Sequence, residues 1–245
     1  MKSKIWAHRG LNQQYPENTI KAIQAAIDLG VDGIEIDVQR TKDGKIIICH
    51  DENLSRLAGT DKMIYELSSK ELETLRIYTP DFSEEHEAIP TLEEVLEVIK
   101  STNVALNIEF KNSIYLYPGM ENQVIELVSD FGLEKQIYYS SFNHKSMAYI
   151  ASLGLGERCG ILYSDILHNP IEYTTNMKVK NLHPALNSFQ LPHFVELARD
   201  NGVKIHVWTV NTDEHLQFAL ARKADAIITD QPARAIELRE KLFHN

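Results

Sequence analysis

Three carboxylates recur at alternating positions of two apolar stretches. In GIEIDVQ, Glu35 and Asp37 share one face of a predicted strand, because successive strand residues point to opposite faces. In NIEFK, Glu109 and Lys111 share a face for the same reason. If these strands are neighbours in a parallel sheet, about 4.8 Å apart, the three acids converge and repel one another unless a cation lies between them. Their hard oxygen atoms favour Mg²⁺ or Ca²⁺ over zinc.

Two histidines accompany these acids. His8 and Arg9 end the first apolar run, KIWAH, and the polar loop GLNQQYPENT follows them. An imidazole exchanges protons near neutral pH, and a guanidinium binds an anion through a rigid pair of donors. The Asp-Gly dipeptide of TKDGK predicts a two-residue hairpin turn, which places His50 opposite Asp37. Taken alone, the acids of the second strand fit a salt-bridged or solvated face, but with Glu109 and both histidines they indicate a metal site open to a phosphate.

Apolar runs of strand length alternate with segments of helical period along the whole chain. The predicted strands are 4–8, 33–39, 104–110, 136–140, 158–163, 179–183, 203–208 and 224–229. In the first predicted helix, Asn18 is the expected N-cap, Ile20, Ile23 and Ile27 recur on one face, and Gly30 provides a left-handed stop. Eight β/α units in 245 residues favour an α/β protein that forms a single (β/α)8 TIM barrel over residues 1–245. Barrel enzymes carry their chemistry at the C-terminal ends of the strands.

Composition excludes several other classes of protein. The chain is 43% hydrophobic and 24% charged, which is typical of a soluble globular protein. Its net charge of −10 argues against a nucleic-acid partner, and nothing indicates stable membrane insertion. Cys49 and Cys159 form no CxxC pattern and are expected to be buried free thiols. A strand is expected so early in the chain that no signal sequence fits before it, which predicts a cytoplasmic location. The oligomeric state is not predicted.

The connection after the second strand is too long for an ordinary βα loop. Residues 51–88 are therefore expected to form a small insertion over the barrel mouth, with a capping box from Ser68 to Glu71 starting a helix. The acidic end of this insertion is either a solvated surface or a feature that favours a cationic alcohol such as choline or ethanolamine. Its acidic residues are Asp81, Glu84, Glu85 and Glu87.

The motifs of this chain resemble those of the glycerophosphodiester phosphodiesterases almost from end to end. They are HRG at 8–10, PENT at 16–19, EIDV at 35–38, HD at 50–51, IPTLEEVL from Ile89, IEFK ending at Lys111, WTVN at 208–211 and TDQP at 229–232. The order and spacing of these pieces make the resemblance specific. It implies a (β/α)8 barrel that uses a divalent metal to hydrolyse a small-molecule glycerophosphodiester to sn-glycerol 3-phosphate and an alcohol.

The resemblance also implies roles for individual residues. Glu35, Asp37 and Glu109 would be the metal ligands, and His8 and His50 would be the acid–base pair. Whether water attacks directly, or the glycerol 2-hydroxyl attacks first to form a cyclic phosphate, stays open at this point.

Four further residues complete the expected site. Arg9 and Lys111 would hold the phosphate, Trp208 would pack on the glycerol moiety, and Glu17 would support the residues of the first strand. Trp6, His183 and His206 are expected to fill the core rather than to join the site.

Two rival functions remain at the sequence level. A phosphodiesterase that acts on an intact lipid would need an apolar or basic rim at the mouth, whereas the insertion is acidic. A binding protein that has lost catalysis would lack one of the histidines or carboxylates, and none is missing from the sequence.

Overall fold

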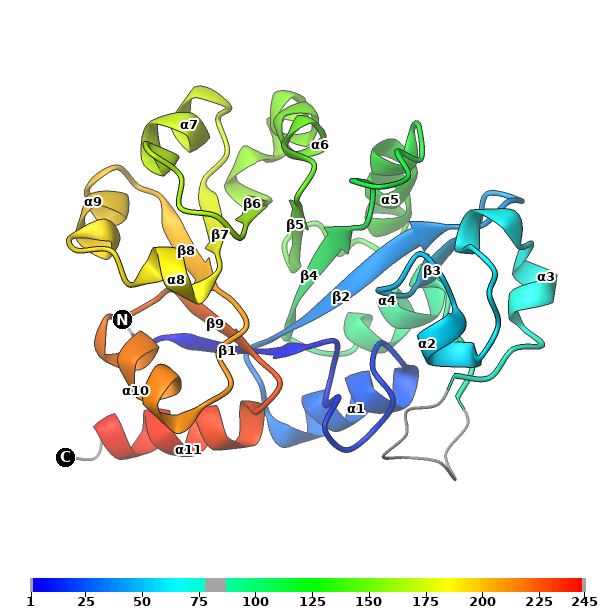
Figure 1. The fold of residues 1–245 in the computed structure, drawn as a ribbon, viewed down its shortest axis with the longest axis horizontal. Helices are drawn as coiled ribbons and strands as arrows, with labels where there is room; N and C mark the ends of the chain where they lie inside the picture. The colour runs from blue at the N-terminus through cyan, green and yellow to red at the C-terminus, as the bar shows by residue number, and fades with distance from the viewer. Residues whose placement is uncertain (1, 78–86, 244–245) are drawn as a thin grey trace.

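Eight parallel strands close into a barrel in the computed structural model, which describes residues 2–77 and 87–243 (Figure 1). The strands are β1 (Lys4–His8), β2 (Gly33–Arg40), β4 (Ala105–Phe110), β5 (Ile137–Ser141), β6 (Cys159–Tyr163), β7 (Asn181–Pro184), β8 (Lys204–Val207) and β9 (Ala226–Thr229). They neighbour one another in the order β1-β9-β8-β7-β6-β5-β4-β2, and pairing of β1 with β2 closes the ring. The predicted TIM barrel is therefore confirmed.

Helices surround the barrel and connect successive strands (Figure 1). They are α1 (Ile20–Leu29), α4 (Leu92–Lys100), α5 (Met120–Asp130), α6 (His144–Ile150), α7 (Pro170–Asn176), α8 (Leu186–Phe189), α9 (Phe194–Asp200), α10 (Asp213–Ala221) and α11 (Pro232–Phe243). Two short helical turns, η3 (Ala151–Leu155) and η4 (Gly156–Arg158), lead into β6. Within the described ranges, no helix has the length and apolar character needed to cross a membrane.

The ends of helix α1 are determined partly by local sequence signals and partly by tertiary contacts. Its N-cap is Thr19, whose hydroxyl accepts from the Ala22 amide at 3.1 Å, so the prediction of Asn18 as N-cap is wrong. Asn18 has a φ of 59°, and its side-chain amide donates to the Asp37 carboxylate at 2.9 Å. Gly30 ends the helix at a φ of 82°, as predicted.

The hairpin after β2 differs from its predicted register by one residue. Strand β3 (Ile46–Ile48) pairs antiparallel with β2, with Arg40 opposite Ile46. The loop has three residues because the Thr41 hydroxyl accepts from the Lys45 amide at 2.8 Å and Gly44 adopts a φ of 89°. Cys49, rather than His50, therefore donates its amide to the Asp37 carbonyl. His50 lies one residue further along the chain.

The insertion after the second barrel strand is present as predicted. Beyond β3 it contains α2 (Ser55–Ala58), η1 (Ile64–Glu66) and α3 (Ser69–Leu72), the last with the predicted Ser68–Glu71 capping box. It has a small apolar core of its own, made of Ile47, Cys49, Leu54, Leu57, Ile64, Leu67, Leu72, Ile77 and Ile89. Asp81, Glu84 and Glu85, the acidic residues discussed above, lie outside the described residues.

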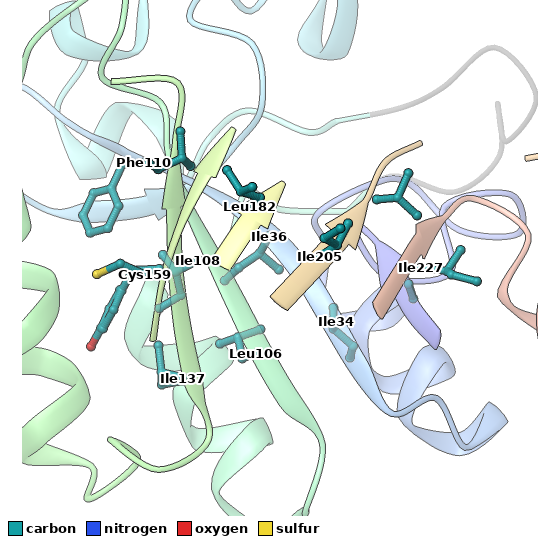
Figure 2. Close-up of a cluster of buried hydrophobic side chains, with 14 of the residues drawn as sticks. Ile34, Ile36, Leu106, Ile108, Phe110, Ile137, Cys159, Leu182, Ile205 and Ile227 are labelled. Atoms are coloured by element: carbon teal, nitrogen blue, oxygen red, sulfur yellow. The ribbon is translucent and has the colours of Figure 1, made fainter. Parts of the chain in front are cut away.

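The main core lies between the strands and the surrounding helices. Figure 2 shows part of it, and its labelled side chains are Ile34, Ile36, Leu106, Ile108, Phe110, Ile137, Cys159, Leu182, Ile205 and Ile227. The alternate residues of β2 and β4 carry the acids, as the predicted period of two requires. Both cysteines are buried and free.

Candidate active site

The three acids converge at the C-terminal end of the barrel. Asp37 on β2 lies opposite Glu109 on β4, and Glu35 lies two residues earlier on the same face. One oxygen from each of the three carboxylates falls within 4.8 Å of the others. Glu35 Oε1 and Asp37 Oδ1 are buried and have no hydrogen-bond partner among residues 2–77 and 87–243. Buried carboxylate oxygens without a partner are costly, so this geometry fits a set of hard ligands for a divalent cation.

Electrostatics within this acidic group are uneven. Burial, together with the neighbouring Asp37 and Glu109 charges, raises the pKa of Glu35 well above its usual value. Burial and Asp37 also raise the pKa of Glu109. At Asp37 burial acts in the same direction, but Arg9 and Lys111 outweigh it and lower the pKa to about 2. The protein's own two cations thus hold the pKa of Asp37 low, whereas the pKa values of Glu35 and Glu109 stay raised, so further positive charge would favour ionisation of these two acids.

Arg9 and Lys111 both contact these acids. The backbone amide of Arg9, at a φ of 58°, donates to the Glu35 carboxylate at 3.1 Å. Its guanidinium Nη1 donates to Glu17 Oε1 at 2.9 Å, and its Nε lies 3.3 Å from Asp37 Oδ2. Lys111 Nζ donates to Glu109 Oε1 at 3.0 Å. Glu17 therefore fixes the position of the Arg9 guanidinium, and its supporting role in the site stays a prediction.

His8 is held by an acid that the sequence analysis missed. Its Nδ1 lies 2.7 Å from Asp230 Oδ1, just after the last barrel strand, and its Nε2 lies 3.8 Å from Glu35 Oε2. Asn12 and Asn211 donate to the two oxygens of Asp230. Burial would raise the pKa of Asp230, but the His8 hydrogen bond and both amides lower it to about 2. The carboxylate thus fixes the ring with Nδ1 protonated and Nε2 pointing away from it.

His50 has a matching partner on the insertion. Its Nδ1 lies 2.7 Å from Asp51 Oδ1, and Arg56 of α2 donates to Asp51 Oδ2 at 2.6 Å. Arg56 also donates twice to Glu17, at 2.9 and 2.8 Å. Because Glu17 contacts Arg9 as well, one chain of ion pairs joins the insertion to the first strand. The hairpin register differs from the prediction, but His50 still reaches the site.

These groups surround a cavity of about 90 Å³ at the barrel mouth. Its lining comprises His8, Arg9, Glu35, His50, Asn107, Glu109, Lys111, Phe142, Leu162, Trp208, Thr209 and Ile228. Of the predicted site residues, Asp37 and Glu17 lie behind this lining and contact Arg9. The Trp208 ring packs edge-on against Phe142 with centroids 5.5 Å apart, and its Nε1 donates to the His183 carbonyl at 2.7 Å.

Several residues of the site were not predicted, among them Asn18, Asp230, Asn107 and Phe142. Asn18 was expected to cap a helix, although its place in PENT already marked it. Asp230 falls in the quoted motif TDQP, which is the signal that could have found it. Asn107 shares the inward face of β4 with Glu109, and Phe142 is an exposed aromatic just after β5.

These observations define an α/β-barrel enzyme with an acidic site at the C-terminal ends of its strands. The model of the glycerophosphoryl diester phosphodiesterase family matches residues 8–234, and the chain belongs to that family. A glycerophosphodiester phosphodiesterase of Caldanaerobacter subterraneus is 37% identical, with 98% of this chain and 99% of the relative covered. One from Bacillus altitudinis is 38% identical over the same shares of the two chains.

A solved structure gives a view of a related site with a ligand. It is a phosphodiesterase of Oleispira antarctica in complex with its product, sn-glycerol-3-phosphate. That protein is 28% identical to this chain, the match covers 98% of this chain and 97% of the other, and the TM-score is 0.83.

Proposed function

We propose that this enzyme hydrolyses glycerophosphodiesters to sn-glycerol 3-phosphate and an alcohol, with a bound divalent cation, Mg²⁺ or Ca²⁺, and with His8 and His50 moving the protons. The observation that carries the proposal is the convergence of three buried carboxylates within 4.8 Å, beside two histidines that are each fixed by a carboxylate. The product held by the Oleispira relative supports the choice of substrate.

Glu35, Asp37 and Glu109 would hold the cation, because their donor atoms are hard and two of their oxygens accept no hydrogen bond from the described residues. When bound, a divalent cation stabilises negative charge on phosphate oxygens and binds water. Arg9 and Lys111 line the same cavity and would contact the phosphate oxygens of the substrate. Both cations now pair with carboxylates, so substrate binding exchanges some of these ion pairs for contacts with the phosphate.

The two histidines would divide the proton transfers. Asp230 accepts from Nδ1 of His8, which leaves the lone pair of Nε2 free to take a proton from the attacking water. As the water oxygen bonds to phosphorus, the bond from phosphorus to the alcohol oxygen breaks. His50, protonated on both nitrogens and held by Asp51, gives its Nε2 proton to the leaving alkoxide. Protons balance, since one histidine gains what the other loses.

Trp208 and Phe142 would form the apolar wall beside the glycerol moiety. Their rings meet edge to face at the cavity, where they would exclude water from one side of the phosphate. The backbone carbonyl of His183 fixes the orientation of the indole ring of Trp208.

The decisive experiment follows release of glycerol 3-phosphate from a panel of glycerophosphodiesters. Protein stripped by a chelator is assayed alone, then with added Mg²⁺ or Ca²⁺. We expect no turnover without metal and restored turnover with at least one of the two cations. Full activity after exhaustive chelation would refute metal dependence, and no glycerol 3-phosphate from any substrate would refute the proposed reaction. A cyclic phosphate that accumulates early would show attack by the glycerol 2-hydroxyl.

A second candidate substrate follows from the rim of the mouth. The loops after β4, β5 and β6 expose large apolar side chains, namely Ile114, Leu116, Phe142 and Ile166. Leu116 is 64% exposed and follows Lys111 in the same loop. This is the apolar rim that a lipid substrate needs, so we propose lysophospholipids with one acyl chain as alternative substrates. The Leu116→Ser variant should lose activity on them and keep its activity on glycerophosphocholine, and an equal loss on both would contradict this.

A further inference from the structure

We propose that the N-terminal end of the barrel holds a second anion site, which binds a phosphate dianion, either free or as the monoester of a small organic group. A cavity of about 420 Å³ lies there, at the opposite end of the strands from the active site. Residues from several strands line this cavity. They include Lys4 and Trp6 of β1, Tyr138 of β5, Lys204 and His206 of β8, and Lys223 at the turn before β9. None of these residues takes part in the proposed catalysis.

The charge of this cavity is opposite to that of the protein as a whole. Its lining includes Lys2, Lys4, Arg199, Lys204 and Lys223, and within the described residues Asp225 is the only carboxylate that lines it. Asp225 Oδ2 already accepts from the Ile205 amide at 2.9 Å, and Lys2 pairs with Glu240. In a chain with a net charge of −10, five cations around one concave space favour a multivalent anion.

His206 adds a directed donor to the wall of this cavity. It is 3% exposed, and its Nδ1 lies 2.9 Å from Nε2 of His183. Burial, with repulsion from His183, Lys204 and Lys4, lowers the pKa of His206 well below its usual value. Burial also lowers the pKa of His183, to about 3. Both rings are therefore neutral at pH 7, and one N–H lies between them.

The partners of His183 decide which ring donates. Nδ1 of His183 is buried and has no hydrogen-bond partner in the part of the chain that the structure describes. A buried N–H without an acceptor is rarer in proteins than an unpaired acceptor. His183 therefore carries its proton on Nε2 and donates to Nδ1 of His206. His206 is then protonated on Nε2, and this N–H points away from His183. A neutral donor in a basic cavity suits an anion.

Shape supports a phosphate-bearing molecule in particular. The cations come from β1 and the residue Lys2 before it, α9, β8 and the turn before β9, and because β1, β9 and β8 are neighbours in the barrel, these charges gather along one arc of its N-terminal end. A phosphate dianion accepts several hydrogen bonds at once, as such an arrangement requires. The rings of Trp6 and Tyr138, with centroids 5.2 Å apart, add an apolar wall beside which an organic group fits.

Tryptophan fluorescence can observe this site separately from the active site. The chain has two tryptophans, so Trp208→Phe leaves Trp6 as the sole indole reporter, at the distal cavity. The Trp208→Phe protein is titrated with inorganic phosphate and, separately, with glycerol 3-phosphate. We expect a saturable change in Trp6 emission with both. Tighter binding of the ester would show that the organic group contributes, and equal binding would assign recognition to the phosphate alone.

Charge variants provide the test of location. In the same background, Lys204→Gln/Lys223→Gln should weaken phosphate binding at least tenfold. The matched pair Lys70→Gln/Lys100→Gln removes two exposed lysines outside the cavity and should leave binding unchanged. All four lysines are exposed, so the fold should persist, and circular dichroism checks it. No saturable change in emission, or the same weakening in both pairs, would overturn the proposal. Neither result depends on turnover, so failure here is separate from failure of the proposed function.

Discussion

At the C-terminal end of the barrel, His8 and His50 each place Nδ1 2.7 Å from a carboxylate oxygen, whereas at the N-terminal end His183 and His206 bond to each other. Side chains of the first pair are 18% and 32% exposed, and the second pair is buried. A carboxylate partner stabilises an imidazolium, while a buried imidazole partner favours neutral rings. Under the proposed mechanism, the same residue type would transfer protons at one end of the barrel, whereas at the other end it makes a fixed hydrogen bond.

The largest expected effect concerns the two histidines at the active site. His8→Ala and His50→Ala should each lower turnover of an alkyl glycerophosphodiester by about 10²- to 10⁴-fold. A nitrophenyl ester has a leaving group that needs no protonation, so His50→Ala should regain much of its activity on that substrate, and His8→Ala should not. Steady-state rates on both substrates measure this. The reverse pattern would exchange the two roles, and unchanged rates in both variants would refute acid–base catalysis.

The next effect separates metal binding from folding. Glu109→Gln keeps the size of the side chain but removes a charge from the acidic group, so the affinity for the metal should fall more than about 100-fold. Loss of a residue that only hydrogen-bonds to a metal ligand typically lowers metal affinity roughly 10- to 100-fold, and loss of a ligand should cost more. Titration calorimetry with Mg²⁺ or Ca²⁺ measures the affinity. Thermal unfolding without metal should be no worse than in the parent protein, since burial raises the pKa of Glu109 and opposes its charge. Unchanged affinity or a collapsed fold would contradict this assignment.

A smaller effect is expected at the acids behind the histidines. Asp230→Asn should lower activity about 10- to 100-fold, the size typical of a partner that orients a functional histidine. Asp51→Asn is its matched variant on the insertion side. Activity on the nitrophenyl ester should recover in Asp51→Asn and remain low in Asp230→Asn. If both variants respond alike to the leaving group, the two carboxylates do not serve histidines with different roles.

The smallest effect lies at the buried pair and concerns stability. The folded-state pKa of His183 and of His206 is below the unfolded value of about 6.5, so protonation favours the unfolded chain. The contribution of the two neutral histidines to the free energy of unfolding is complete above pH 6.5 and is lost as the pH falls toward the folded-state pKa values. The loss is at most about 1.4 kcal/mol per histidine for each pH unit. Urea unfolding at pH 7.5 and 5.5 should show a weaker pH dependence in His183→Gln/His206→Gln. His168→Gln, at an exposed position, should behave like the parent protein.

Most of the fold could be predicted from the period of two in the strand sequences. Alternation placed Glu35, Asp37 and Glu109 on the inward face, and the structure agrees, because a period of two leaves no other face once the apolar residues are buried. The hairpin register failed for a local reason, since the Thr41 hydroxyl bonds to the Lys45 amide and lengthens the turn by one residue. Propensity rules for Asp-Gly turns do not include that side chain.

Contacts between residues far apart in the sequence could not be predicted from local sequence patterns. Asp230 reaches His8 across 222 positions of the sequence, and no periodicity relates the two. Asn18 has the residue type and position of a helix cap, but a left-handed backbone turns its side chain toward Asp37. In both cases the fold, rather than the neighbouring residues, determines what the side chain does.

The bond between His8 and Asp230 joins the end of the first barrel strand to the residue after the last one. The ring of barrel strands closes only when the first and last strands pair. Contacts between residues so far apart in sequence form slowly. Until β9 pairs with β1, His8 has no orienting carboxylate, whatever structure the intervening strands have gained. Catalytic competence should therefore appear late in refolding, after most of the helix signal has returned. A ribosome-bound chain without residues 216–245 should be inactive, since it lacks β9, which closes the barrel, as well as Asp230.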